Sequence, residues 1–334
     1  MLMRRSENYI DFLKGNLVLF VILGHCMLFG FTNTITSEYT VESNYLFRFI
    51  YSFHMPLFML ISGYFTFNSI KKKSFKEIIK IRFNQLIFPL LLLSIITSLN
   101  NQDFLNMVIY KFFTNFWFGW AIFYYTILVY IVEKNNIKIL YLVFFVLLIF
   151  IQIPNSMVFK FELIFFLVGF YIRKNKIDFK NYLYKLDEKK YFIILIILIL
   201  TTFLYTEKMP IHITGVFDAL TFDNIQINIT RWLLGLINSY FVALLIKYVY
   251  KVIPPFLKKI FSLLGQNSYE LYIIHCYLVQ GILKKLAIIL GLKFNYFMLF
   301  IEFIIISLFS ILILFILKNI IKWLKLTYKK CYIK

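Results

Sequence analysis

The fold is decided by a stretch near the N-terminus, residues 10–31, which reads IDFLKGNLVLFVILGHCMLFGF. A helix needs about 20 mostly apolar residues to cross a bilayer, and this stretch is long enough. Similar stretches recur along the chain. The 334 residues are 61% hydrophobic and only 16% charged, whereas soluble domains are about 25% charged. This composition excludes a soluble enzyme, a nucleic-acid-binding protein and a secreted disulfide-stabilised domain.

The apolar stretches predict an all-α, polytopic membrane protein with about ten transmembrane helices. The connections between them are short, so we expect residues 1–334 to form a single integral-membrane domain. The candidate spans lie near residues 10–31, 45–67, 78–99, 116–132, 137–153, 157–172, 191–206, 229–249, 268–290 and 296–317.

The net charge of +20 is distributed unevenly between alternate connections. Basic residues gather at 71–76, 173–190, 247–259 and in the tail after 318, and they are sparse in the other connections. Because loops rich in Lys and Arg remain in the cytoplasm, this asymmetry predicts that both termini are cytoplasmic. It also accounts for the basic charge without nucleic acid. We expect a multi-pass protein of the cytoplasmic (inner) membrane, and the sequence leaves its oligomeric state open.

Polar residues inside spans are the informative ones, because each is costly in lipid and tends to face the interior of the bundle. In the first span Lys14 and His25 are eleven residues apart, so they share a helical face within about 20° and are separated by about 16 Å along the axis. Asp11 lies one turn before Lys14. The stripe therefore carries an acid, a base and a deep imidazole. A purely structural interpretation pairs Lys14 with Asp11 and gives His25 an interhelical hydrogen bond.

The second and third spans carry a further polar set. Pro56 removes one helical hydrogen bond, so the turn beside His54 must pack against other helices or a cavity. Ser62 follows two turns later. At the start of the third span, Arg82 and Gln85 are one turn apart and form a basic mouth with nearby lysines. A packing role for His54 and a topological role for Arg82 remain open alternatives.

The ninth span contains His275, for which a packing role and a supporting or acceptor-side role are both open. Asn267 and Glu270 have the spacing of a capping box. The adjacent pairs His25–Cys26 and His275–Cys276 resemble metal-ligand pairs. Adjacent helical residues point about 100° apart, however, so we expect no metal site.

Four segments together resemble the membrane acyltransferase family 3, specifically its fucose 4-O-acetylase-like branch. The segments are Asp11-x-x-Lys14-Gly15 through Gly24-His25, Phe53-His54-Met55-Pro56 through Ser62-Gly63-Tyr64, Arg82 through Pro89, and Gly265 through Leu271-Tyr272-x-x-His275. Two positions depart from the family pattern, which has arginine where this chain has Lys14 and Gln85. Lysine lacks the bidentate fork of arginine, and glutamine lacks the charge.

The resemblance implies acetyl-coenzyme A as the acyl donor and a sugar hydroxyl of a surface polysaccharide or lipid-linked glycan precursor as the acceptor. A neutral imidazole suits proton transfer, and cationic groups suit phosphates. The site expected on this basis has His25 as the catalytic base, Lys14, Arg82 and Gln85 as donor-binding residues, and Asp11, His54, Ser62 and His275 as supporting or acceptor-side residues.

A carrier is the competing class of function. Many short-looped spans with buried polar groups are also typical of transporters, exporters and flippases, here of a small acylated or glycan-related compound. An internal inverted repeat would favour transport, and the sequence shows none.

Overall fold

The computed structural model describes residues 8–31, 41–99, 103–114, 116–143, 156–177, 188–209 and 222–332, and these residues contain helices and no strand. The all-α prediction is therefore confirmed over this part of the chain. The main helices are α1 (Asn8–Phe29), α2 (Tyr45–Lys72), α3 (Phe75–Arg82), α4 (Phe88–Ser98), α5 (Phe104–Thr114), α6 (Trp117–Asn135), α8 (Ser156–Lys174), α10 (Glu188–Leu204), α11 (Phe222–Val252), α12 (Pro255–Gln266), α13 (Ser268–Tyr277), α14 (Lys284–Leu290) and α15 (Tyr296–Tyr332).

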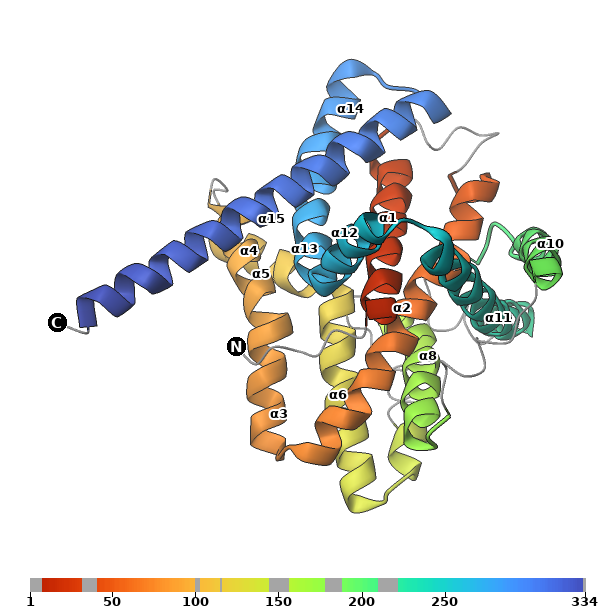
Figure 1. Cartoon of the computed structure of the whole chain (residues 1–334), viewed down its shortest axis with the longest axis horizontal. Helices are drawn as coiled ribbons and strands as arrows, with labels where there is room; N and C mark the ends of the chain where they lie inside the picture. Colours follow the sequence, from red (N-terminus) through yellow and green to blue (C-terminus); the bar gives the residue numbers. More distant parts are fainter. Residues whose placement is uncertain are drawn as a thin grey trace. The chain divides into compact units, whose positions relative to one another are not determined.

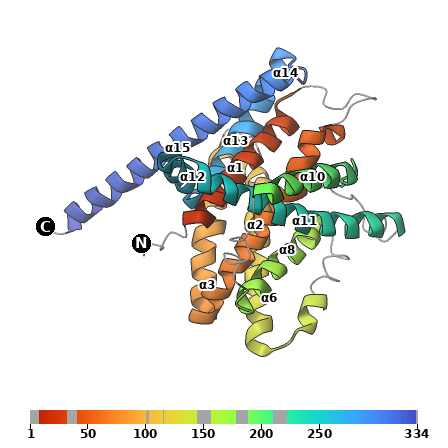
Figure 2. The same cartoon turned by 45° about the vertical axis from the view of Figure 1, so that its right-hand side comes forward.

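The chain divides into two compact units. The first unit combines residues 1–50 with residues 246–334, and the second comprises residues 51–245. In the first unit, α12, α13 and α15 lie beside α1 in both views (Figure 1, Figure 2). The expectation of a single domain stays a prediction.

A close helix crossing joins the two ends of the chain in the first unit. A Cβ built on Gly265 would stand 1.6 Å from the carbonyl oxygen of Asp11, and one built on Gly15 would stand 1.9 Å from that of Phe261. Only glycine allows the backbones of α1 and α12 to approach this closely. The crossing fixes the start of α13, because α12 ends at Gln266 and α13 begins at Ser268.

In the second unit, α11 covers the proline turn of α2. Asn238 donates to the Ser52 hydroxyl at 2.8 Å, and the Ser239 hydroxyl lies 3.5 Å from the carbonyl oxygen of Phe53. Ser52 is the residue four positions before Pro56, where proline leaves the helical carbonyl without its usual donor. The expectation that this turn packs against another helix is confirmed.

A π-helical turn, η2 (Phe83–Ile87), separates α3 from α4. It ends just before Pro89, which has no N–H to donate within the helix. The turn closes with the N–H of Phe88 bonded to the carbonyl of Phe83, five residues earlier. Such wide turns shift the faces of the following residues, which matters for Gln85 below.

The described residues contain six helices long and apolar enough to cross a membrane: Tyr9–Phe29, Tyr45–Lys72, Phe75–Ser98, Ile225–Val252, Ser268–Leu290 and Tyr296–Trp323. A seventh is added if α5 and α6, bent by 61°, form one span. The expected number of about ten is not confirmed. The apolar part of α10 is shorter than a span, and the predicted span at 137–153 lies largely outside the described residues.

The cytoplasmic position of both termini stays a prediction that cysteine labelling can test. On a Cys331→Ser background, Lys73→Cys should resist a membrane-impermeant maleimide added to intact cells, because it lies in a lysine-rich connection. Lys293→Cys, in the exposed turn before α15, should react. Cys26 and Cys276 are buried and should give little background. Labelling of position 73 from outside would overturn the orientation.

Candidate active site

The polar stripe of α1 begins with an ion pair. Nζ of Lys14 lies 2.8 Å from Oδ1 of Asp11, and both side chains are largely buried. The side-chain amide of Gln266, at the end of α12, approaches the other Asp11 oxygen at 3.4 Å. The structural pairing of Lys14 with Asp11 is thus present, and the glycine crossing of α1 with α12 holds it in place.

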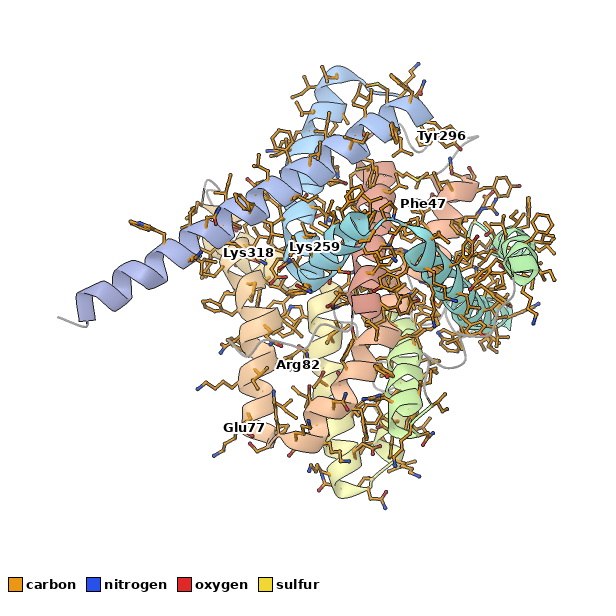
Figure 3. All side chains as sticks on the ribbon, in the orientation of Figure 1. Phe47, Glu77, Arg82, Lys259, Tyr296 and Lys318 are labelled. Carbon is orange, nitrogen blue, oxygen red and sulfur yellow. The ribbon has the colours of Figure 1, made fainter. Side chains whose placement is uncertain are left out.

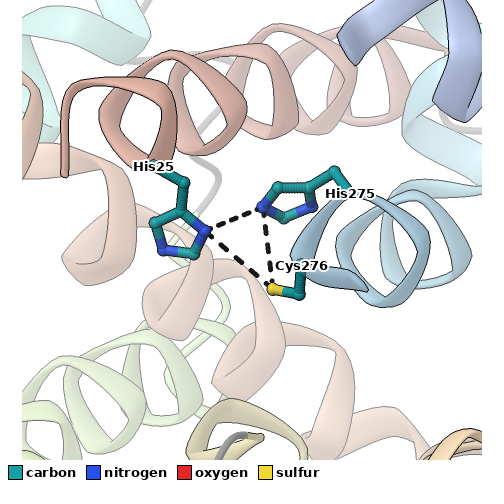
Figure 4. A group of neighbouring side chains, drawn as sticks. All are labelled: His25, His275 and Cys276. Atoms are coloured by element: carbon teal, nitrogen blue, oxygen red, sulfur yellow. Dashed lines mark hydrogen bonds between the residues drawn. The ribbon is translucent and has the colours of Figure 1, made fainter. Parts of the chain in front are cut away.

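At the other end of the stripe, His25 meets His275 of α13. Nδ1 of His25 and Nε2 of His275 are 2.9 Å apart, a hydrogen-bonding distance, and the two rings are stacked with their centroids 5.0 Å apart (Figure 4). His275 is fully buried, whereas His25 keeps partial exposure. The interhelical hydrogen bond foreseen for His25 exists, and its partner is the other histidine that the motifs singled out.

The hydrogen bonds determine which nitrogen of His25 is basic. Nδ1 of His275 lies 3.0 Å from the carbonyl oxygen of Leu271, which can only accept, so Nδ1 carries the proton. In a neutral ring Nε2 of His275 is then an acceptor, and Nδ1 of His25 must donate to it. The lone pair of His25 is consequently left on Nε2. A neutral pair is favoured because unpaired charge is expensive in apolar surroundings.

Cys276 completes this cluster. Its Sγ lies 3.7 Å from Nε2 of His275 and 3.9 Å from Nδ1 of His25, and these three ligand-type atoms lie within 4.8 Å of one another. His275 and Cys276 are neighbours on α13, and their side chains were expected to point too far apart to share a partner. That argument is wrong here, because the ring of His25, on α1, lies near both of them. Among the residues that the structure describes, these three side chains are the group that could hold a metal ion. The expectation of no metal stays a prediction.

Further polar contacts surround the start of α13, at the Lys14 end of the first unit. Lys318 lies on α15 (Figure 3). Its Nζ hydrogen-bonds the side-chain oxygen of Asn267, whose amide donates to the carbonyl of Leu263. The predicted capping box is wrong, because Asn267 makes no side-chain cap to α13. Its side chain instead joins α15 to α12. A second cation, Lys247, is buried with its Nζ 5.7 Å from the centre of the Tyr9 ring.

Arg82 and Gln85, in the second unit, differ in their surroundings. Arg82 is half-buried at the end of α3 and donates to the Thr66 hydroxyl at 3.3 Å (Figure 3). Gln85 lies in the π-turn and is exposed. A π-turn departs from the α-helical spacing assumed for these two residues, and their shared role in donor binding stays a prediction.

His54 and Ser62 also belong to the second unit, on α2. His54 is 2% exposed and its ring packs edge-on against Tyr51 with centroids 4.7 Å apart. The Ser62 hydroxyl donates to the carbonyl of Phe58 in its own helix at 2.8 Å. These contacts are typical of packing and back-bonding. The supporting roles of His54 and Ser62 stay predictions.

Three residues of the first unit were not assigned to the site from sequence. They are Cys276, which the helical geometry of the sequence argued against as a metal ligand, Lys318, which lies at the start of the basic tail, and Glu302. No local pattern connects them to His25 or Lys14, because their helices are far apart along the chain. The sequence offers one indirect signal: the segments at 11–25 and 265–275 both carry the family resemblance, which suggests that α1 and α13 contribute to one site.

Comparisons with curated proteins match only a short part of the chain. Two curated relatives align with a short segment: Nodulation protein NolL of Mesorhizobium japonicum, 42% identical over 81 residues, and NolL of Sinorhizobium fredii, 44% identical over 82 residues. Each alignment covers 24% of this chain and 21% of the relative, so about a fifth of those proteins is matched. No solved structure matches the chain.

The family assignment rests on a much longer match. Residues 7–318 fit the model of the acyltransferase 3 family, described as an acyltransferase domain. This range includes α1, α13 and the histidine pair, together with the proline turn of α2 and the π-turn after α3. The chain is a multi-pass membrane protein that belongs to the acyltransferase 3 family.

Proposed function

We propose that the protein is a membrane O-acetyltransferase that moves the acetyl group of acetyl-coenzyme A to a sugar hydroxyl of a surface polysaccharide or lipid-linked glycan precursor. The observation that carries the proposal is the chain of hydrogen bonds from Leu271 through His275 to His25. It orients a general base on the candidate membrane span α1, and acyl transfer to a hydroxyl requires such a base. The resemblance of the motifs to the fucose 4-O-acetylase-like branch supports a sugar as the acceptor.

The reaction follows from the free lone pair on Nε2 of His25. As the sugar hydroxyl attacks the thioester carbonyl, its proton passes to Nε2 and a C–O bond forms. The tetrahedral intermediate then collapses, the C–S bond breaks, and the proton on Nε2 passes to the departing thiolate. His275 accepts a hydrogen bond from Nδ1 of His25 throughout, and this bond is strengthened while His25 is cationic.

Cations near the Lys14 end of the first unit suit the donor. Coenzyme A is polyanionic and is made in the cytoplasm, where that end lies in the predicted topology. Lys14 and Lys318 provide ammonium groups for its phosphates, and Asp11 orients Lys14. Lys14 is about 16 Å from His25 by helical rise, so an extended pantetheine arm would bring the thioester to the imidazole.

The test of the proposed function is acetyl transfer by the purified protein. With radiolabelled acetyl-coenzyme A and an alkyl glycoside in detergent, we expect an alkali-labile acetyl ester on the sugar. The same preparation in liposomes should move no glycoside across the bilayer. Solute flux without ester formation would instead identify a carrier and overturn the proposal.

Arg82 offers a test of donor binding. Arg82→Ala should weaken acetyl-coenzyme A binding by about 1–2 kcal/mol, or about five- to 30-fold, because one charge-assisted hydrogen bond to a phosphate is lost. Lys80→Ala is the matched control. Lys80 is exposed and lies two residues before Arg82, and its replacement removes the same charge. It should change the donor affinity less than twofold. Equal donor affinity in wild type and Arg82→Ala would reduce Arg82 to a topological charge.

A further inference from the structure

Glu302 is a buried carboxylate that the mechanism above does not use. It lies on α15 in the first unit, six residues after the helix begins, and is 5% exposed. Neither Oε1 nor Oε2 has a hydrogen-bond partner among the residues that the structure describes. A buried carboxyl group without a hydrogen-bond partner is costly in apolar surroundings, so Glu302 is a candidate for binding a polar ligand.

The carboxylate sits against the end of α1, at Gly30. A Cβ built on Gly30 would stand 2.1 Å from Oε2 of Glu302, so the carboxylate occupies space that any larger residue at position 30 would fill. Gly30 follows His25 by five residues, or about 7.5 Å of helical rise.

His25 therefore lies between two different polar regions of the first unit. Along α1, the Asp11–Lys14 pair is on one side of His25, and Glu302 is on the other. The first region is cationic and suits the phosphates of the donor. The second holds a carboxyl group, which gives polyanionic phosphates no favourable partner, so it suits the other substrate.

We infer that Glu302 binds the acceptor, by accepting hydrogen bonds from hydroxyl groups of a sugar. The inference rests on the proposed function and specifies its acceptor side. A carboxylate offers two acceptor oxygens in one plane, and neighbouring hydroxyls of a sugar ring offer two donors. Bound in this way, the sugar satisfies the buried carboxylate and holds a further hydroxyl towards His25.

The test uses Glu302→Gln, which keeps the size of the side chain and removes its charge. The probe is octyl α-L-fucopyranoside, together with its monodeoxy analogues. Glu302→Gln should weaken probe binding to the donor-free protein by about ten- to 100-fold, and change acetyl-coenzyme A binding less than twofold. The matched control is Ser310→Ala, because the Ser310 hydroxyl is buried on the same helix and donates only to the local carbonyl of Ile306. It should leave both affinities unchanged.

The deoxy analogues separate a binding role from a structural one. Wild type should bind at least one monodeoxy analogue about tenfold more weakly than the parent, because the missing hydroxyl leaves Glu302 unpaired. Glu302→Gln should show less than threefold discrimination against the same analogue. A purely structural Glu302 would predict a lower unfolding temperature in Glu302→Gln with the discrimination retained.

The outcomes distinguish failure of this inference from failure of the proposed function. Equal probe binding by wild type and Glu302→Gln overturns the inference, whether or not acetyl is transferred. Acetyl transfer by wild type with no change of acceptor affinity in Glu302→Gln overturns the inference alone. Glycoside binding that depends on Glu302, with no acetyl transfer under any condition, supports the inference and overturns the acetyltransferase. Absence of glycoside binding and of transfer overturns both.

Discussion

Replacement of His25 by alanine is expected to lower the rate of acetyl transfer by about 10²–10⁴-fold, the usual contribution of a general base. The loss follows from the hydrogen-bond chain. Nε2 of His275 is engaged as an acceptor, so the free basic nitrogen of the two histidines is Nε2 of His25. No other group of the first unit is oriented in this way among the described residues. The measurement is radiolabelled acetyl on an alkyl glycoside at saturating donor and acceptor.

Two further measurements keep the His25 result interpretable. Acetyl-coenzyme A affinity should change little in His25→Ala, because Lys14 is about 16 Å away by helical rise. The variant should also insert and unfold like wild type, since alanine is a good helix former and His25 is only partly buried. Transfer within threefold of wild type, with donor affinity intact, would refute His25 as the base.

Removal of the His275 acceptor is expected to have the second largest effect. His275→Phe keeps a ring in the space but cannot accept from Nδ1 of His25, so the tautomer and orientation of His25 are no longer fixed. We expect acetyl transfer to fall by about ten- to 100-fold, a part of the contribution of the base itself. The fall should appear in kcat, with the KM for acetyl-coenzyme A unchanged.

His275→Gln is the matched variant for this prediction. Glutamine places an amide oxygen near the position of Nε2, where it can accept from Nδ1 of His25. It should therefore restore most of the activity lost in His275→Phe. If the two variants are equally impaired while both remain folded, His275 acts through packing and the tautomer argument is refuted.

Hydropathy predicted the positions of several helices. It did not predict how many of the described helices are long enough to cross a membrane. The stretches at 10–31, 45–67 and 268–290 coincide with helices of span length. The stretch at 191–206 coincides with the shorter α10, whose apolar part is too short for a span by this measure. Hydropathy records where apolar residues occur, but helix length also depends on where the chain bends, as between α5 and α6.

The π-turn shows a local feature that the sequence pattern concealed. The spacing of Arg82 and Gln85 predicts one face of an α-helix, and Pro89 was visible in the sequence. How the backbone adapts before a proline depends on the helices around it. The structure widens the turn at Phe83–Ile87, which leaves Gln85 exposed while Arg82 reaches Thr66.

The sequence by itself indicated the membrane environment, the all-α fold class and the polar stripe of α1, which consists of Asp11, Lys14 and His25. These follow from composition and from a period of 3.6 residues, which are local properties that need no partner helix. The pairing of Lys14 with Asp11 is also local, because the two residues are one turn apart. The tertiary structure alone decided that His25 meets His275 and Cys276, and that Glu302 sits against Gly30. Those contacts join residues more than 200 positions apart, and they depend on which helices pack together, here through the Gly15–Gly265 crossing.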